Sequence, residues 1–289
     1  NKKVLLLLFT LILFFYTSPC HSADVIVVGN TELKPVNEII KGIKETLDSP
    51  VKTYLPSDIK GKLGGIAAKE EAKVVIALGR EALEEALKLP ESIAVIYDLV
   101  ITPPPINRSN TTGVYMATPV KEYVDLVRTY LPSIRQIAVV GSHGLMRILD
   151  GVGKPHVASY SVTNSLELVS TVKHLDAADA VLLLPDVALL TASAVEEVYL
   201  FSFRKNIPLL GISERHVKQG ALLALVFEPV SVGRQLGERA SDAIRGIDIG
   251  MVPPSPSQKF ELYINKDTAK KMNINIPAEL LRKANRVYP

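Results

Sequence analysis

The 289-residue sequence predicts an α/β protein of two lobes, each a doubly wound parallel sheet with helices on both faces. Three observations lead to this prediction. Uninterrupted runs of valine, isoleucine and leucine recur along the chain, as in strands that are buried on both faces. Helical spacing of apolar residues follows most of these runs. The strand–helix rhythm then restarts near Thr118 without a residue-level repeat, which indicates two lobes alike in pattern only.

The first series of elements starts at Asp24. Pro35 marks the first turn of a helix, because a first turn leaves its N–H groups unpaired and proline has none. The pair Gly64-Gly65 falls within a helical pattern and indicates close packing rather than a phosphate-binding loop. Consecutive prolines make residues 102–110 a stiff loop. The expected strands of this half are 24–30, 51–55, 73–79 and 92–98, with a short helix at 80–89.

The second series opens with a helix over residues 118–132. Thr118 is expected at its N-cap, Pro119 at its first position and Pro132 beyond its end. Further helices are expected at 164–175, from the end of the third strand to about Lys205, and at 230–245. The expected strands are 136–142, 156–162, 180–186, 207–213 and 220–229, followed by a Pro/Ser-rich linker at 252–258, a strand at 259–265 and a final helical segment.

The N-terminal segment predicts export. Two lysines precede an apolar core from Val4 to Tyr16, and small or polar residues follow up to Ala23, which is the layout of a secretory signal peptide over residues 1–23. The core is shorter than the roughly 20 residues that span a bilayer, although an uncleaved anchor helix is the alternative. We therefore expect the mature protein in the periplasm.

Cys20 is the only cysteine, and it lies inside this export segment. Lipidation at Cys20 is not favoured, because Thr17 and Pro19 stand where a lipoprotein usually has leucine and a small residue. Without a second cysteine, no disulfide and no Cys/His metal framework can form, and we expect no cofactor. A net charge of +3 and the lack of a dense basic tract argue against nucleic acid as a partner.

Polar side chains follow the ends of the predicted strands. Ligands of open parallel sheets bind beyond the carboxyl ends of the strands, and a cleft for a small polar ligand needs hydrogen-bonding groups of this kind. The candidate ligand-binding residues are therefore Asn30, Thr31, Arg80, Tyr97, Asp98, Ser142, His143, Asp186, Ser213, Glu214 and Glu228.

Most of these residues have a structural alternative. Arg80 and His143 suit a solvated helix turn and a loop, and Asp98 suits a turn. Asp186 interrupts the apolar run 180–190, where the dipole of the following helix would stabilise a carboxylate with no ligand present. The residues that suit helix N-caps are Asn30, Thr31, Ser142 and Ser213.

The sequence offers no catalytic constellation, so we expect a protein that is not an enzyme. Ser142 and His143 are adjacent, but neighbours in sequence rarely form a nucleophile–base pair, which is a spatial arrangement with an orienting acid. The G-x-S-x-G, P-loop and HExxH patterns are absent. A periplasmic hydrolase that uses Ser142 and His143 is the least favoured hypothesis.

Several segments carry a family resemblance. They are NTTGV (110–114), VRTYLPSIRQIAVV (127–140), DAADAVLLLPDVALLTASAVEEV (176–198), NIPLLGISERHVKQGALLAL (206–225) and INKDTAKKMNINIPAELLRKANRV (264–287). In this order and spacing they resemble the ABC-transporter substrate-binding proteins of the tryptophan/tyrosine-type group, which have the type I periplasmic-binding fold. The resemblance implies two lobes joined by a hinge, with the ligand in the cleft. The lobes are expected at 24–117 plus 229–253 and at 118–228 plus 254–289.

The resemblance also bears on the candidate residues. Asp186 maps onto an aspartate that lies at the cleft in the family. Ser213 and Glu214 map near an acidic or serine pair, and Asp98 is offset from the family's aspartate in its segment. Glu228 maps onto an acidic position, although Pro229 stands where the family has tyrosine.

We therefore expect an exported, monomeric substrate-binding protein that captures a small, amino-acid-like solute and delivers it to the membrane permease of an ABC transporter. The alternative is a sensor with the same fold and a degraded cleft, which signals to a membrane receptor. The abbreviated segment 141–155 and the prolines at 103–105 motivate this alternative.

Overall fold

The computed structural model describes residues 23–149, 151–186 and 188–289. The predicted signal peptide, up to residue 22, and Cys20 lie outside the described residues. The chain forms two compact units, one from Asn1–Val114 with Pro229–Ser255 and the other from Tyr115–Glu228 with Pro256–Pro289. It therefore passes between the units three times, after Val114, Glu228 and Ser255.

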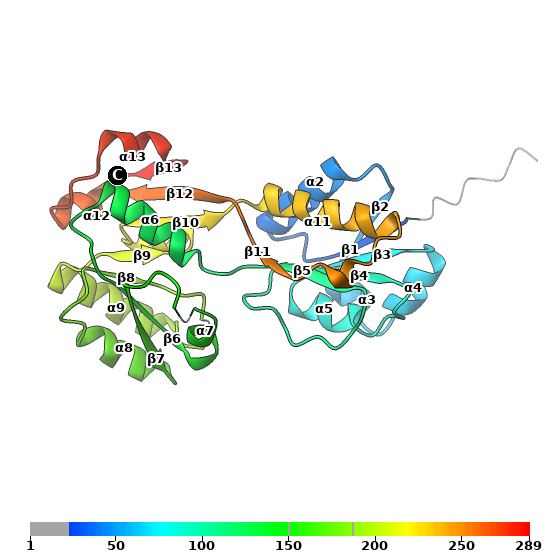
Figure 1. Cartoon of the computed structure of the whole chain (residues 1–289), viewed down its shortest axis with the longest axis horizontal. Helices are drawn as coiled ribbons and strands as arrows, with labels where there is room; N and C mark the ends of the chain where they lie inside the picture. The colour runs from blue at the N-terminus through cyan, green and yellow to red at the C-terminus, as the bar shows by residue number, and fades with distance from the viewer. Residues whose placement is uncertain (1–22, 150, 187) are drawn as a thin grey trace, which may run out of the picture. The chain divides into compact units, whose positions relative to one another are not determined.

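The first unit contains a six-stranded sheet in the order β11-β5-β4-β3-β1-β2. The strands β1 to β5 pair in parallel, and β1 and β3 are buried along their whole length, as their uninterrupted apolar sequences predict. Figure 1 shows α2 and α11 on one face of this sheet and α3, α4 and α5 on the other. The strands are β1 Val25–Val28, β2 Val51–Tyr54, β3 Val74–Leu78, β4 Ala94–Asp98, β5 Thr111–Tyr115 and β11 Ser255–Pro256; the helices are α2 Lys34–Thr46, α3 Pro56–Ile59, α4 Leu63–Lys69, α5 Arg80–Ala86, α11 Pro229–Ile244 and the 3-10 turn η1 Ile249–Met251.

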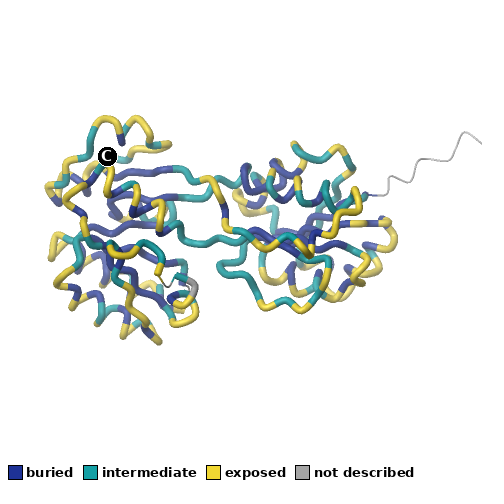
Figure 2. The backbone as a smooth tube through the Cα atoms, viewed as in Figure 1, coloured by how far each residue is buried: buried dark blue, intermediate teal, exposed yellow. Residues whose placement is uncertain are grey.

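The second unit contains a seven-stranded sheet in the order β13-β12-β10-β9-β8-β6-β7. Apolar clusters cover both faces, one joining α6 and α13 to the strands and the other joining α8 and α9 to them, and Figure 2 shows the buried residues gathered along the strands. The strands are β6 Ile137–Ser142, β7 Val157–Val162, β8 Ala180–Leu182, β9 Leu209–Gly211, β10 Leu223–Phe227, β12 Phe260–Asn265 and β13 Arg286–Tyr288; the helices are α6 Val120–Tyr130, α7 His143–Ile148, α8 Ser165–Lys173, α9 Ala192–Lys205, α10 Glu214–Gln219, α12 Lys266–Lys271 and α13 Ala278–Lys283.

The predicted fold class is confirmed, with one difference in strand direction. In the second sheet, β10 and β12 run antiparallel, from Leu223 opposite Ile264 to Phe227 opposite Phe260, whereas β6 with β7, β6 with β8, β8 with β9, β9 with β10 and β12 with β13 pair in parallel. The chain enters β12 after its last passage from the first unit, so no βαβ crossover fixes its direction.

Helices α2 and α11 pack closely enough to require glycine. A Cβ added at Gly42 would clash with the Val230 carbonyl oxygen, and one added at Gly233 would clash with the Ile39 carbonyl oxygen. By contrast, nothing lies within 4 Å of a Cβ added at Gly64 or Gly65 in α4. The prediction of close packing at Gly64-Gly65 is therefore wrong, because those two positions face open space.

Other differences lie at element ends. Helix α6 begins at Val120 with Pro119 as its N-cap residue, so Thr118 does not cap it. The expected linker contains β11, a short edge strand in which Pro256 is tolerated because an edge strand needs fewer ladder donors. The expected final helical segment contains α12 and α13 and then the strand β13.

Candidate functional site

The strand order of the second sheet reverses between β6 and β8. From β6 the chain continues to β7 on one side and then returns to β8 on the other. Such a switch point is where open α/β sheets bind ligands beyond the carboxyl ends of their strands. Ser142 ends β6, and Asp186 follows the end of β8.

Asp186 and Ser142 contact each other at this switch point. Asp186 is 8% exposed, and its Oδ2 accepts a hydrogen bond from the Ser142 backbone N–H at 3.1 Å. Ser142 is the N-cap residue of α7 and makes no side-chain cap hydrogen bond. The carboxylate thus lies against the N-terminus of α7, where the partial positive charge of the helix end favours an anion.

The helix after Asp186 is capped by another residue. Thr191 Oγ1 accepts from the Ala194 N–H at 3.3 Å and caps α9. The Asp186 backbone carbonyl accepts from the Leu190 N–H at 2.8 Å, which closes a turn between the strand and the helix. Asp186 therefore does not cap the helix that follows it, and its carboxylate contacts the start of α7 instead.

His143 begins α7 and is exposed. Its Nδ1 lies 3.4 Å from the Ser161 hydroxyl of β7. Among the described residues, no hydrogen bond joins the His143 ring to the Ser142 hydroxyl. The pair therefore lacks the contact that a nucleophile and its base require.

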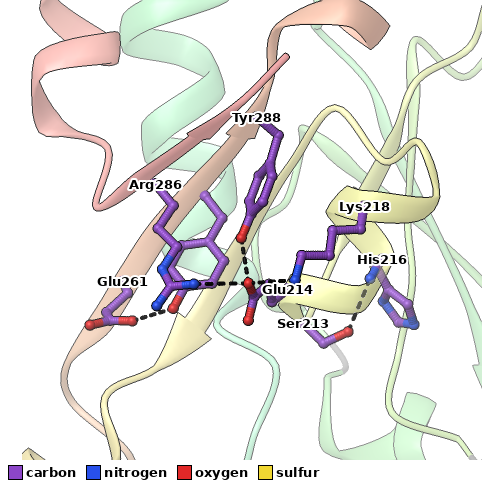
Figure 3. Close-up of polar contacts among 8 residues, drawn as sticks. Ser213, Glu214, His216, Lys218, Glu261, Arg286 and Tyr288 are labelled. Atoms are coloured by element: carbon purple, nitrogen blue, oxygen red, sulfur yellow. Dashed lines mark hydrogen bonds and ion pairs between the residues drawn. The ribbon is translucent and has the colours of Figure 1, made fainter.

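The end of β9 leads into the short helix α10 (Figure 3). Ser213 Oγ accepts from the His216 N–H at 3.3 Å and caps the helix. His216 Nδ1 accepts from the Ile212 N–H at 3.2 Å, which places the proton of a neutral ring on Nε2. Burial and the neighbouring Arg215 lower the pKa of His216, so this ring is neutral at pH 7 and acts as an acceptor for the backbone.

Glu214 is held by groups of its own unit. Its Oε1 accepts hydrogen bonds from the Tyr288 hydroxyl at 2.5 Å and from Arg286 Nη1 at 3.0 Å, and it pairs with Lys218 Nζ at 2.9 Å (Figure 3). The Tyr288 and Lys218 contacts lower the pKa of Glu214 to about 2. This carboxylate ties α10 to β13, and its charge is balanced without a ligand; its predicted ligand contact stays a prediction.

The Glu214 contacts predict an acid-sensitive fold. The folded-state pKa of about 2 lies below the ordinary value of 4.5, so the stabilisation is complete above pH 4.5 and is lost as the pH falls toward 2. We expect the Tm of the Glu214→Gln variant to fall less steeply than that of the wild type between pH 4.5 and pH 2.5. Glu84→Gln, on an exposed face of α5, is the control that removes a carboxylate elsewhere. Parallel Tm curves for wild type and Glu214→Gln would contradict this assignment.

Tyr123 supports the same end of the sheet and was not predicted from the sequence. Its fully buried hydroxyl donates to the Gly211 carbonyl oxygen of β9 and accepts from the Leu225 N–H of β10 at 2.7 Å. Burial raises the pKa of Tyr123. The hydroxyl thus bridges the two strands just before Ile212, and only the buried position of this tyrosine on α6 signals that role.

In the first unit, the strand order reverses between β1 and β3. Asn30 follows β1, and its Oδ1 accepts from the Glu32 N–H at 3.0 Å, which closes a turn; the N-cap residue of α2 is Leu33. The Thr31 carbonyl accepts from Asn37 Nδ2 at 2.5 Å. Arg80 is exposed at the start of α5. Asn30, Thr31 and Arg80 thus follow β1 and β3 at the carboxyl edge, and Asn30 closes a turn rather than caps a helix.

Asp98 ends β4 and is 1% exposed. Neither of its carboxylate oxygens has a hydrogen-bond partner among the described residues. Burial raises the pKa of Asp98 to about 7, against the lowering effects of the Leu99 N–H and the Arg239 charge. Tyr97 is equally buried, with its ring against Gly113. In this conformation Tyr97 and Asp98 present almost no surface to a ligand.

Glu228 is the last residue of the second unit before a passage to the first, and it is half-buried. Its N–H donates to the Lys259 carbonyl at 3.0 Å, ahead of β12. Within residues 23–149, 151–186 and 188–289, no group of His, Cys, Asp and Glu side chains could hold a metal ion, and no helix is long and apolar enough to cross a membrane.

Several solved structures share the fold, and we describe two that cover 92% of this chain and 99% of their own. One is a ligand-free, open structure of a substrate-binding protein with adhesive properties from Clostridium difficile, with a TM-score of 0.69 and 16% identity. The other is an ABC domain in complex with L-Trp from Streptococcus pneumonia, with a TM-score of 0.60 and 19% identity. At these identities the likeness shows the fold, that of type I periplasmic-binding proteins.

The sequence itself matches a family and a characterised relative. A tyrosine-binding protein of Clostridioides difficile (strain R20291) is 23% identical over 174 residues, which are 57% of this chain and 50% of that protein, so the match spans half the relative's length. The model of the ABC transporter substrate binding protein family matches residues 100–288, more than half of the chain. The chain belongs to this family of substrate-binding proteins, which are not enzymes.

Proposed function

We propose that this protein binds a small, amino-acid-like solute between its two lobes after export and delivers it to the permease of an ABC transporter. The observation that carries the proposal is the buried Asp186 carboxylate at the β6/β8 switch point. Family membership supports the transport role, and the tyrosine-binding and L-Trp-bound relatives support an amino acid as the ligand.

The chemistry of Asp186 suits the ammonium group of an amino acid. An ionised carboxylate can accept about four hydrogen bonds, and the Ser142 N–H occupies one of these positions. A buried charge is expensive unless a partner balances it, so a cationic group that enters this edge of the sheet would be bound strongly. A carboxylate elsewhere on the ligand would need donors, which the backbone N–H groups at strand ends can provide.

The first experiment is a solute screen. L-Tyrosine, L-tryptophan and the other standard amino acids are added to the purified protein in a thermal shift assay, followed by titration calorimetry of each hit. A ligand at 100 times its Kd should stabilise the fold by about 2.7 kcal/mol. If no amino acid in the panel raised the Tm, this result would contradict an amino-acid ligand.

A charge-specific variant tests Asp186. Asp186→Asn keeps an oxygen acceptor for the Ser142 N–H and removes the negative charge, so we expect the fold to persist and the Kd to rise about tenfold to a hundredfold. The matched control is Asp179→Asn, because Asp179 Oδ2 accepts the N–H groups of Arg135 and Gln136 at 2.8 and 2.9 Å at the opposite edge of the same sheet. Equal losses of affinity in both variants would contradict a ligand role for Asp186.

Signalling to a membrane receptor is the second candidate function. The observation that favours it is the short length of α7: among the described residues, this six-residue helix is the only helix between β6 and β7. Crosslinking in membranes separates the two: capture of a permease supports delivery, and capture of a receptor histidine kinase supports sensing.

A further inference from the structure

Two of the three passages between the units run through neighbouring strands. Strands β5 and β11 are adjacent at the edge of the first sheet, and each reaches the boundary of the first unit, at Val114 and Ser255. Thr112 Oγ1 donates to the Val252 carbonyl at 2.7 Å before the boundary. Where the two lobes close on a ligand, the backbone of these strands has to bend close to this boundary.

One arginine binds both strands next to the boundary. Arg239, on α11, donates from Nη1 to the Gly113 carbonyl of β5 and from Nη2 to the Ser255 hydroxyl of β11 at 2.6 Å. Gly113 is the residue before Val114, and Ser255 is the last residue of its segment in the first unit. A planar guanidinium can make both bonds at once because its donors have a fixed geometry, which lysine lacks.

Asp98 interacts electrostatically with Arg239. It ends β4, the neighbour of β5, and the charges of Asp98 and Arg239 interact within the buried end of the sheet. Burial raises the pKa of Asp98, and the Arg239 charge offsets only part of this rise, after the effect of the Leu99 N–H. The hydrogen bonds to Gly113 and Ser255 keep Arg239 at the strand ends.

We propose that Arg239 is a positioning residue for lobe closure, which fixes β5 and β11 at the edge of the first unit and confines bending to the residues beyond Val114 and Ser255. Without this tie, the ends of both strands move freely, and the ligand-free lobes sample more orientations. Ligand binding then has to order these residues as well, which weakens affinity without removing a ligand contact. The expected effect of Arg239 on affinity rests on the proposed binding function. Its expected effect on the mobility of the β5 and β11 ends does not.

The test compares Arg239→Gln with Arg234→Gln. Arg234 lies on the same helix, is exposed and pairs with Glu45 at 2.9 Å, so its loss removes an arginine without touching β5 or β11. Hydrogen exchange of residues 111–115 and 252–257 is measured without ligand. We expect at least tenfold faster exchange in Arg239→Gln, an unchanged rate in Arg234→Gln, and a partial recovery in Arg239→Lys.

Affinity and shape give the second readout. X-ray scattering of ligand-free Arg239→Gln should show a broader distribution of interatomic distances, and its Kd for the amino acid found in the solute screen should rise about tenfold. If no amino acid binds the wild type, the proposed function fails, while exchange and scattering still decide the role of Arg239. If Arg239→Gln does not fold, Ser255→Ala removes one of the two bonds and is measured in the same way. Unchanged exchange and scattering in the folded variant would overturn the proposal.

Discussion

Replacing Gly233 with alanine is expected to unfold the first unit or to lower its free energy of unfolding by about 3 kcal/mol or more. The added methyl group would clash with the Ile39 carbonyl oxygen and would also approach the Gly42 Cα at 2.9 Å, so both obstacles are backbone atoms of α2. Overpacking of this kind costs about 1–3 kcal/mol where side chains can shift, and backbone atoms shift less easily. The total free energy of unfolding of a typical domain is only about 5–15 kcal/mol.

Urea denaturation followed by circular dichroism measures this effect. The matched control is Gly64→Ala in α4, where an added methyl group meets nothing within 4 Å. Because alanine favours a helix interior by about 1 kcal/mol over glycine, Gly64→Ala should leave the stability unchanged or raise it. If the two variants unfolded at the same urea concentration, close packing of α2 against α11 would not be what requires Gly233.

The Tyr123→Phe variant is expected to lose about 3 kcal/mol of unfolding free energy. Phenylalanine fills the same space but leaves two buried backbone groups, the Gly211 carbonyl and the Leu225 N–H, without the hydroxyl that bonds both. A buried polar group left without a partner costs about 1–3 kcal/mol. The change lies at the end of β9, so we also expect the turn at Ile212 and Ser213 to become less ordered.

Tyr199→Phe is the matched control for this variant. The Tyr199 hydroxyl donates one hydrogen bond, to the His216 carbonyl at 2.9 Å, from a buried position on α9. We expect a loss of about 1 kcal/mol, since one bond rather than two disappears. Chemical denaturation of both variants, with amide exchange at residues 211–214, gives the comparison. A larger loss in Tyr199→Phe than in Tyr123→Phe would contradict the bridging role of Tyr123.

The strands were predictable because burial on both faces leaves a strong compositional signal. The run Val25–Val28 and the run Val74–Leu78 are strands that are buried throughout. The run from Ala180 is less regular: its strand ends at Leu182, although Leu183 and Leu184 are buried as well. Apolar composition reports burial there rather than strand pairing, so the end of β8 could not be read from it.

The contacts of the candidate site were less predictable, because they join residues far apart in sequence. The position of Asp186 after a central strand follows from the sequence, whereas its contact with Ser142 depends on which strands are neighbours. Glu214 follows β9 as expected, but three partners from α10 and β13 occupy its Oε1, and β13 lies where a helical segment was expected. The prediction of close packing at Gly64-Gly65 failed for the same reason. The glycines at the close helix contact, Gly42 and Gly233, are far apart in sequence and meet only in the folded chain.

The distance in sequence between α2 and α11 sets an order of events in folding. The apolar face of α2, with Val36, Ile39 and Ile43, is completed by a helix that begins at Pro229. A growing chain that stops short of α11 therefore carries a first unit whose core is open to water, while the whole sequence of β6 to β10 is already present. Contacts of such long range form slowly, so we expect the core of the first unit to close late in folding.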